Sequence, residues 1–495
     1  MSVIAPEIVK SLQTGEFGLN QLMTGNLSQT TFERLQKALV ASPSTPGGPG
    51  DGSSLIPQSL ARTLKNVSFK MKNIKAWKNS PKQNAYAMTE EFDQLISYGT
   101  RGGVFTSAMQ TPQGNDSTFA RVQVPMKYMA VAYATDIAIM STEVVGGSAE
   151  ALQINNATRY LLRGVEKAIF YGNSSLLPYA FNGWKVQIEN FATNNGFSNI
   201  VIDAQAGPLT PELLENAAQA IQDNAGEISS GNYKVYMAPA VQAYWSKMYA
   251  PSQRYGIDQR AFMEEGALIT GTPVGGYNST FGFLPFENDI FLNPDVPNNI
   301  TIQGAPATPT GVTATLNTND PNSKWQTPAS PSQYGVGYNG GPVSYVVEAV
   351  NAAGPSVVST ATSAVTVGAG ESVTVTWNRV SGANYYQIYR SMNGGQFLPV
   401  AQVADSGSGT TQSWTDENTT VAGAYDVFII NHDPEEGAVF KQLLPFFKWP
   451  LPIPALARYF AVALIGAPII YVPSRCVLIK NVQIPNASIA PVELT

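Results

Sequence analysis

The sequence predicts an α+β protein whose chain is interrupted by an inserted all-β sandwich. One long helical pattern, at residues 148–171, is surrounded by shorter helices and short β segments. Residues 304–424 differ, because they show only short period-two alternation between turn residues. The stretches on either side, 281–297 and 426–437, both read as strand-and-turn pieces of one host domain.

The composition indicates how the surface of the chain is used. The chain has 495 residues, enough for two to four domains, and only 13% of them are charged. Soluble domains usually carry about 25% charged residues. Either much of the surface is hidden against other chains, or a β-rich surface is built from Ser, Thr, Asn and Gly. Composition alone favours neither interpretation. The net charge of −6 gives no sign of a basic nucleic-acid-binding surface.

The residues that carry chemistry are sparse. A single cysteine, Cys476, and a single histidine, His432, exclude an intrachain disulfide and any multi-Cys or multi-His metal site. Cys476 precedes three aliphatic residues and is expected to be buried. His432 and Asp433 open a DPEEG segment, where a turn-cap role is expected. The GTRGG stretch at 99–103 lacks P-loop spacing. We therefore expect no catalytic, cofactor-binding or metal residues, and no enzyme.

Residues 1–54 are expected to form an N-terminal arm and linker. Short helical pieces precede a Pro/Gly/Ser-rich stretch at 42–54. The first residues lack a basic segment followed by an apolar core, so no secretory signal is expected. The most apolar stretch, 455–472, is interrupted by Arg458, Gly466 and Pro468. We expect buried strands there and no membrane contact.

The first part of the host, 55–303, opens with an extended loop and a long helix. A hairpin is expected at about 100–128, with a turn-rich tip at 110–117. A lone ribbon of this kind is marginal in water, so it is expected to lie on a neighbouring subunit. The helix at 148–171 has Ser148 as N-cap and Gly172 as C-cap. Gly164 inside it is expected to meet another backbone closely, because glycine costs about 1 kcal/mol there.

Two shorter helices and several strands are expected at about 200–300. Thr210 caps one helix and Pro211 begins it, while Pro239 begins the other. Short β segments are expected at 234–237, 275–286 and 290–292.

The segment 304–424 has the pattern of a sandwich with its own core. Tyr345, Val347 and Ala349 alternate with more polar residues, and Val373, Val375 and Trp377 do the same. Trp377 with the tyrosines at 385, 386 and 389 could form an aromatic sugar-binding face. Core packing explains Trp377 better, while alternation leaves at least one tyrosine outside.

One stretch of the host carries a family resemblance. Residues 164–184 read GVEKAIFYGNSSLLPYAFNGW, in which Glu166 precedes a YGN turn and an FNG turn followed by Trp184. This stretch, together with the order of arm, extended loop, long helix, axial-domain elements and returning strands (425–495), resembles the major capsid proteins of tailed bacteriophages. The resemblance implies the Hong Kong 97 phage-type fold, with the long helix as its spine and an axial domain at about 200–300.

The same resemblance implies a function and a set of partners. Copies of the chain would assemble, as hexamers and pentamers, into an icosahedral head shell. The shell would enclose double-stranded DNA through weak non-specific contact. Portal and decoration or cement proteins would be further partners. The protein would be found in the virion after assembly in the host bacterial cytoplasm, and no membrane would be involved.

The insert resembles a fibronectin type III or bacterial immunoglobulin-like domain. Residues 345–356 (YVVEAVNAAGPS) resemble a late strand of that family, and 375–390 resemble its Trp-bearing and Tyr-rich strands. The late-strand motif comes first here, which departs from the family's order and leaves the strand topology open. An outward-projecting insert is expected. The alternatives are an encapsulin-type compartment shell, and a sandwich-bearing adhesin or carbohydrate-binding protein.

Overall fold

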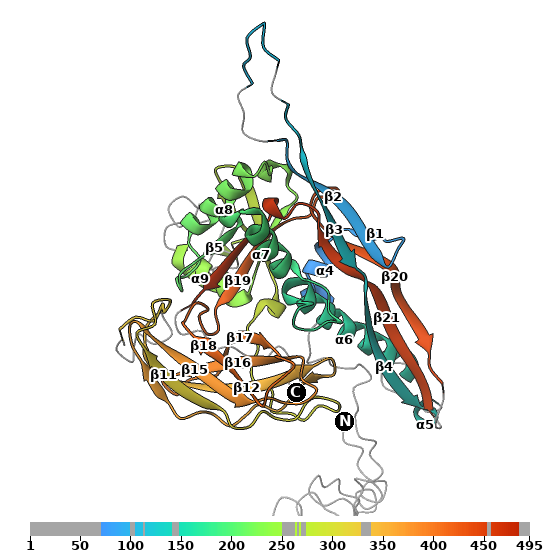
Figure 1. The fold of residues 1–495 in the computed structure, drawn as a ribbon. Helices are drawn as coiled ribbons and strands as arrows, with labels where there is room; N and C mark the ends of the chain where they lie inside the picture. The colour runs from blue at the N-terminus through green and yellow to red at the C-terminus, as the bar shows by residue number, and fades with distance from the viewer. Residues whose placement is uncertain are drawn as a thin grey trace, which may run out of the picture. The chain divides into compact units, whose positions relative to one another are not determined.

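The computed structural model (Figure 1) describes residues 71–99, 104–111, 114–140, 148–249, 263–264, 267–268, 274–327, 338–452 and 457–484. The expected N-terminal arm and linker at 1–54 lie outside the described residues.

The longest helix of the host lies against a four-stranded sheet. The sheet has the order β1 (Lys82–Asn84), β20 (Ala438–Pro450), β21 (Ala457–Ile470), β4 (Lys127–Asp136). Helix α6 (Ala149–Tyr171) runs along β4 and β21 (Figure 1). Its buried face includes Ala157, Leu161, Val165 and Ile169, at helical spacing. The long helix expected at 148–171 is therefore confirmed, with Ser148 at the N-cap and Gly172 at the C-cap.

A second host sheet has six strands and carries three helices. Its order is β5 (Val201–Asp203), β22 (Val477–Val482), β19 (Tyr425–Asn431), β6 (Tyr233–Met237), β10 (Gly282–Asn288), β9 (Gly276–Ser279). The helices are α7 (Trp184–Asn195), α8 (Pro211–Asp223) and α9 (Pro239–Tyr249). The Thr210 hydroxyl accepts a bond from the Leu213 N–H, as expected of an N-cap. The apolar stretch expected as buried strands forms β21, whose second half is buried.

The remaining elements are short. In sequence, helix α4 (Ala76–Asn79) precedes β1 and helix α5 (Ile137–Met140) follows β4. Strand β7 (Met263–Glu264) pairs with β8 (Ala267–Leu268). The 3-10 turns are η2 (Met71–Asn73), η3 (Ser198–Ile200), η4 (Ile228–Ser230), η7 (Ile290–Leu292) and η9 (Pro473–Arg475). No helix of the described residues is both long and apolar enough to span a bilayer.

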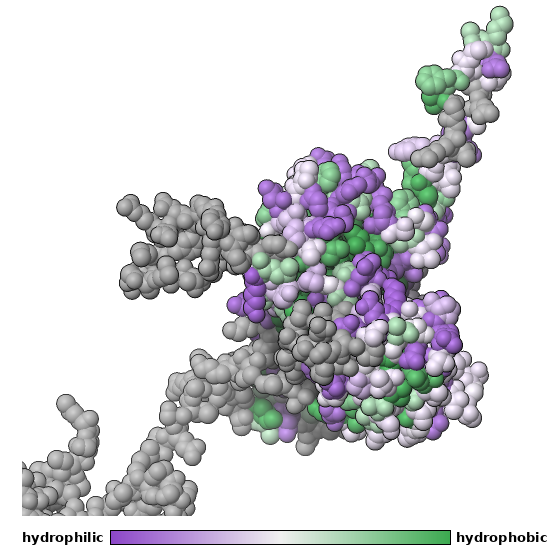
Figure 2. Space-filling model, turned by 90° about the vertical axis from the view of Figure 1, so that its left-hand side faces the viewer, coloured by the Kyte–Doolittle hydropathy of each residue, from purple (hydrophilic) through white to green (hydrophobic). Residues whose placement is uncertain are grey.

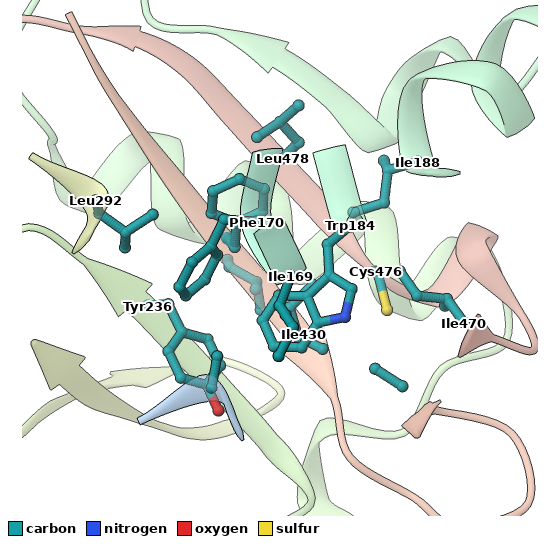
Figure 3. Packing of buried hydrophobic residues seen from close by; sticks show 14 of the residues in the cluster. Ile169, Phe170, Trp184, Ile188, Tyr236, Leu292, Ile430, Ile470, Cys476 and Leu478 are labelled. Carbon is teal, nitrogen blue, oxygen red and sulfur yellow. The ribbon is translucent and has the colours of Figure 1, made fainter. Parts of the chain in front are cut away.

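The two host sheets share one core, in which aromatic rings meet at the end of α6. Phe170 is fully buried, and its ring lies 5.2 Å from that of Trp184, 5.8 Å from Tyr236 and 5.3 Å from Phe428. Figure 3 shows Phe170, Trp184 and Tyr236 converging from α6, α7 and β6. Rings at these spacings add to the free energy of area burial. Two residues of the stretch that carried the resemblance are therefore central packing residues.

The two glycines of that stretch are required by close backbone contact. A Cβ on Gly172 would lie 2.6 Å from the carbonyl oxygens of Ala168 and Phe181, and one on Gly183 would lie 2.6 Å from the Ala168 oxygen. The Gly183 N–H donates to the Gly172 oxygen at 2.8 Å. The YGN and FNG turns thus lie against each other and fix the start of α7 beside the end of α6.

Glu166 joins α6 to the segment with which the described chain begins. Its side chain is fully buried, and its carboxyl oxygens accept bonds from the N–H groups of Lys75 (2.6 Å), Ala76 (2.6 Å) and Trp77 (2.7 Å). These are the free N–H groups at the start of α4. A residue on one helix therefore caps another helix 90 positions away in sequence.

Residues 304–424 contain eight strands in two further sheets. One has the order β11 (Thr313–Thr318), β15 (Glu371–Asn378), β18 (Thr411–Asp416). The other contains β13 (Gly354–Pro355), β12 (Gly341–Asn351), β16 (Tyr385–Met392) and β17 (Leu398–Ala404), with β14 (Val365–Val367) also paired to β12. Their side chains form a core separate from that of the host, centred on Trp377, Tyr345 and Tyr386.

The strand order explains the misplaced sequence motif. Strand β12, which carries the late-strand motif, pairs with β16, whereas β11 pairs with β15. The chain therefore leaves β11 for the opposite sheet, makes β12 to β14 there, and returns to β15 beside β11.

A buried ion pair lies in this second core. The Arg390 guanidinium donates to the Asp416 carboxylate at 2.6 Å, and both side chains are 1% exposed. The Tyr345 hydroxyl donates to the same carboxylate at 2.8 Å, and the Trp325 ring lies 4.4 Å from the guanidinium. Burial, followed by the charge of Asp416, raises the pKa of Tyr345.

Three expectations about the helices and strands of the host are wrong. The outgoing arm of the hairpin is β2 (Thr89–Ser97), and the return arm divides at Met126 into β3 (Thr118–Pro125), paired with β2, and β4 of the four-stranded sheet. Residues 290–292 form a 3-10 turn capped by Asp289, not a strand. A Cβ on Gly164 would meet nothing within 4 Å, because this residue is on the exposed face of α6.

We predict that Glu166→Ala will destabilise the subunit. Three N–H groups at the start of α4 would lose their acceptor, and each buried group left unpaired costs about 1–3 kcal/mol. Urea denaturation should show a loss of at least ~2 kcal/mol relative to the wild type. Asn155→Ala, at an exposed position of the same helix, serves as control. Equal midpoints for the two variants would contradict this role of Glu166.

Candidate interaction surface

Strands β2 and β3 form a two-stranded ribbon that leaves the rest of the host. Among the described residues, these strands pair only with each other. One face is polar, with Arg121 bonded to Asp93 at 2.9 Å and Gln123 bonded to Glu91 at 2.7 Å. The other face holds Phe92 and the half-buried valines of β3. Alternation of this kind requires that one face be covered.

The base of the ribbon is fixed to the host by specific contacts. The Phe92 ring lies 5.1 Å from that of Tyr471, edge to face. The Gln94 side-chain amide donates to the Tyr471 carbonyl oxygen at 2.6 Å, and Lys441 pairs with Glu90 at 2.9 Å. The ribbon therefore starts from a defined position on the edge of the four-stranded sheet.

The outer end of the ribbon exposes large apolar side chains. The exposed fractions are 85% for Tyr98, 88% for Val104, 96% for Phe105 and 99% for Met109. Hydrophobic residues are visible along this extension in Figure 2. Single exposed apolar residues are normal, but a contiguous set on one segment marks an interaction surface. We call these four residues the apolar end of the ribbon.

A groove of about 400 Å³ lies between the base of the ribbon and α7. Its apolar lining includes Phe92, Val122, Phe181 and Phe191, and the amides of Asn190, Asn194 and Asn195 contribute polar groups. Lys127 is its one charged lining residue, and that ammonium donates to the Pro178 oxygen at 2.7 Å. The Ser174 hydroxyl in the lining donates to Asn182 Oδ1 at 2.8 Å. Among the described lining residues, no hydroxyl or thiol is bonded to a base, so the groove offers packing surface.

The lone histidine and the lone cysteine are both buried. His432 Nε2 and the Tyr236 hydroxyl are 2.7 Å apart, and burial lowers the pKa of His432 to about 3. The expected turn cap is instead Asp433, whose carboxylate accepts bonds from the N–H groups of Glu435 and Glu436. Cys476 is fully buried, as expected, and burial raises the pKa of its thiol to about 12. Neither residue is available as a nucleophile or a metal ligand.

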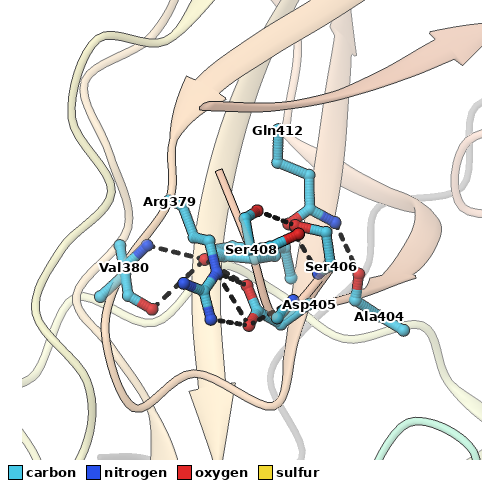
Figure 4. Close-up of polar contacts among 9 residues, drawn as sticks. Arg379, Val380, Ala404, Asp405, Ser406, Ser408 and Gln412 are labelled. Atoms are coloured by element: carbon cyan, nitrogen blue, oxygen red, sulfur yellow. Dashed lines mark hydrogen bonds and ion pairs between the residues drawn. The ribbon is translucent and has the colours of Figure 1, made fainter. Parts of the chain in front are cut away.

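The four aromatic residues considered for a sugar-binding face are buried or half-buried, so the expectation that at least one tyrosine lies outside is wrong. Trp377 and Tyr386 are fully buried, Tyr389 is 3% exposed, and Tyr385 is half-buried. The Tyr386 hydroxyl accepts a bond from the Val380 N–H at 2.7 Å. Beside it, Arg379 and Asp405 form a two-pronged ion pair at 2.6–3.0 Å (Figure 4). These four residues thus form no flat exposed platform of the kind that stacks on a sugar ring.

Within the described ranges, no three His, Cys, Asp or Glu side chains are arranged to hold a metal ion.

Sequence reasoning found the extended loop, but it did not find the four-residue apolar end as a set. Phe105 and Met109 belong to no periodic pattern, so nothing in the sequence distinguished them from core residues.

No family model matches the sequence, and no curated protein matches it. Solved structures of shell proteins are similar to it. The capsid of the native GTA particle covers 90% of this chain and 99% of its own, at 9% identity and a TM-score of 0.43. Gordonia phage Cozz covers 89% and 98%, at 11% identity and a TM-score of 0.41. The SrpI encapsulin complex from Synechococcus elongatus covers 85% and 92%, at 8% identity and a TM-score of 0.38.

These matches are of the kind that the sequence resemblance named. With TM-scores below 0.5, however, the function has to follow from the elements of the chain itself.

We predict that His432 will stay neutral throughout the mildly acidic range. Its folded pKa lies below the unfolded value of 6.5, so its contribution to stability is present above pH 6.5 and is lost as the pH falls toward 3. The carbon and proton resonances of selectively labelled histidine should not shift between pH 8 and about 4.5. A titration midpoint near 6.5 would contradict the buried, neutral state.

Proposed function

We propose that this chain is the major capsid protein of a tailed bacteriophage, the repeating subunit of an icosahedral head shell. The observation that carries the proposal is the ribbon β2–β3 with its exposed apolar end. A two-stranded ribbon is marginally stable in water by itself. Phe105 and Met109 are almost completely exposed at its end. Contact with a neighbouring copy would cover these side chains and order the ribbon.

The rest of the host supplies a rigid base for such a contact. Helix α6 is fixed at its end by the contact of Gly172 with Gly183, and at its start Glu150 bonds with Lys448 and Arg458 of the sheet. Because the ribbon is fixed to a rigid subunit, its contact would hold the neighbouring subunit at a defined angle. Repetition of that angle closes a shell instead of forming an open chain.

The composition agrees with such an assembly. A chain with 13% charged residues can bury much of its surface against copies of itself, as hexamers and pentamers require. The net charge of −6 suits an inner wall that touches packaged double-stranded DNA only weakly. Portal and decoration proteins would be the further partners. The protein would reside in the virion after assembly in the bacterial cytoplasm, in a structural and non-enzymatic role.

Residues 304–424 would form an immunoglobulin- or fibronectin III-like domain that projects outward. The chain reaches the insert from β10 through residues 289–303 and returns from it directly into β19; β10 and β19 flank β6 on either side. Asn288 and Phe428 pair with neighbouring residues of β6, so the two exit strands are about 10 Å apart. Ends this close together allow a whole domain to occupy one host loop.

Electron microscopy of the purified protein tests the proposal. Closed particles support a shell, and nucleic acid inside particles made during infection distinguishes a phage head from an encapsulin-type compartment. A monodisperse monomer at all concentrations would refute the proposal and favour an adhesin-like protein.

We predict that the double substitution Phe105→Ser, Met109→Ser will block assembly without unfolding the subunit. Both side chains are nearly fully exposed, so their removal costs the isolated chain little free energy. Sedimentation should show at least a tenfold loss of particles while circular dichroism stays unchanged. Ile300→Ser, a 44% exposed position before the insert, is the control. Wild-type particle yield from the double variant would show that the apolar end is not an interface.

We also predict that the insert is dispensable for assembly. Its core shares no residue with that of the host, and its exit strands are close together. Replacement of residues 305–423 by a short Gly/Ser linker should leave particles intact and thinner at the outer surface in micrographs. A folded monomer that no longer forms particles would contradict this independence.

A further inference from the structure

Two carboxyl groups lie together in the interior of the host, beside the start of α4. Glu166 and Asp289 are both fully buried. Their side chains are within hydrogen-bonding reach of each other. Asp289 comes from the cap of η7, which follows β10, so the two acids arrive from different parts of the chain.

Every carboxyl oxygen of this pair except one accepts a hydrogen bond from a backbone N–H group. Both Glu166 oxygens accept backbone N–H bonds, and one Asp289 oxygen accepts the Phe291 N–H at 2.8 Å. The other Asp289 oxygen, Oδ2, accepts no hydrogen bond from any residue that the structure describes. A buried acceptor without a donor is costly, and two buried carboxylates in contact are more so. A proton held between the two acids removes both costs.

The nearby cations are occupied elsewhere. Lys75 pairs with Glu287 at 3.0 Å, and Lys234 lies 3.7 Å from the same carboxylate. The Lys82 ammonium donates to the carbonyl oxygens of Trp77 and Ser80. The other facing groups are the tyrosines 171 and 236, whose pKa values are raised by burial and which therefore stay neutral. None of these groups forms an ion pair with Glu166 or Asp289 among the described residues.

We propose that Glu166 and Asp289 form a proton-binding site, in which one proton is shared between the two carboxyl groups and fixes η7 and the start of α4 to helix α6. Burial, and then the neighbouring charge, raises the pKa of Glu166, and burial raises that of Asp289. The site belongs to the folded subunit and does not depend on the function proposed above.

The shared proton makes stability depend on pH in a defined direction. In the unfolded chain both acids titrate near pH 4, so above that pH the folded subunit holds one proton more than the unfolded chain. The stabilisation is complete below the unfolded pKa values and declines as the pH rises through that of the pair. Across this window the unfolding constant should rise about tenfold per pH unit from this site alone.

Infrared spectroscopy of the full-length chain tests for the proton directly. The wild type at pH 6 should show the carbonyl band of a protonated carboxyl group, and Asp289→Asn and Glu166→Gln should each lose it. Glu348, another buried acid, has its pKa raised to about 7, but it contributes equally to all spectra and cancels in the difference. Asp223→Asn, an exposed matched substitution, should keep the band. A wild-type spectrum identical to that of Asp289→Asn would overturn the proposal.

Urea denaturation between pH 5 and 7 gives a second readout. Asp289→Asn places an amide donor beside Glu166, so the stability of this variant should not depend on a shared proton. The ratio of the wild-type unfolding constant to that of Asp289→Asn should therefore rise by up to tenfold per pH unit. Parallel stability curves for the two proteins would mean that no proton is shared. If neither variant folds, the wild type is compared with Glu348→Gln, which removes the other buried acid. A carbonyl band that remains in Glu348→Gln at pH 6 supports the shared proton, and its absence overturns the proposal.

Discussion

The bond between the Glu166 carboxyl group and the N–H groups of residues 75–77 is the contact on which the rest of the host depends. It brings the first described segment of the chain onto the long helix, and β1 can then pair with β20 a few residues later. The same helix ends in Phe170, around which the rings of α7, β6 and β19 gather. One buried polar group and one ring, a turn apart on α6, therefore set the positions of both sheets.

Much of this arrangement could be predicted from the sequence, because periodicity and capping are local signals. Ser148, Gly172, Thr210 and Pro211 marked helix ends correctly. Glu166 was recognised within a motif, but its partners were not, since a bond across 90 residues leaves no local pattern. The close backbone contact predicted at Gly164 was wrong for a related reason, because a glycine in a helix does not reveal which face of the helix it is on. The hairpin was misplaced because β3 and β4 form one continuous alternating run, and only tertiary pairing divides it at Met126.

The interaction surface was the least predictable part. Val104, Phe105 and Met109 are ordinary core residues by type, and only the structure shows them 88–99% exposed. The insert shows the opposite case. Its alternating pattern was strong enough to predict a sandwich, whereas the pairing of β11 with β15 needed the structure, because the path of the chain between them is not fixed by pattern. Local sequence patterns thus predict individual helices and strands, whereas the pairing of strands depends on the tertiary structure.

The attachment of the insert has a mechanical consequence. Its C-terminal end continues directly into β19, and its N-terminal end is joined to β10 through residues 289–303. Strands β10 and β19 are interior strands of the six-stranded sheet, on either side of β6. A pull on the C-terminal end of the insert is therefore borne directly by the backbone hydrogen bonds that β19 makes with β22 and β6. Force on this end of the insert reaches a strand that is buried along its whole length. The strand pairing of β19 therefore resists separation of the insert from the host under load.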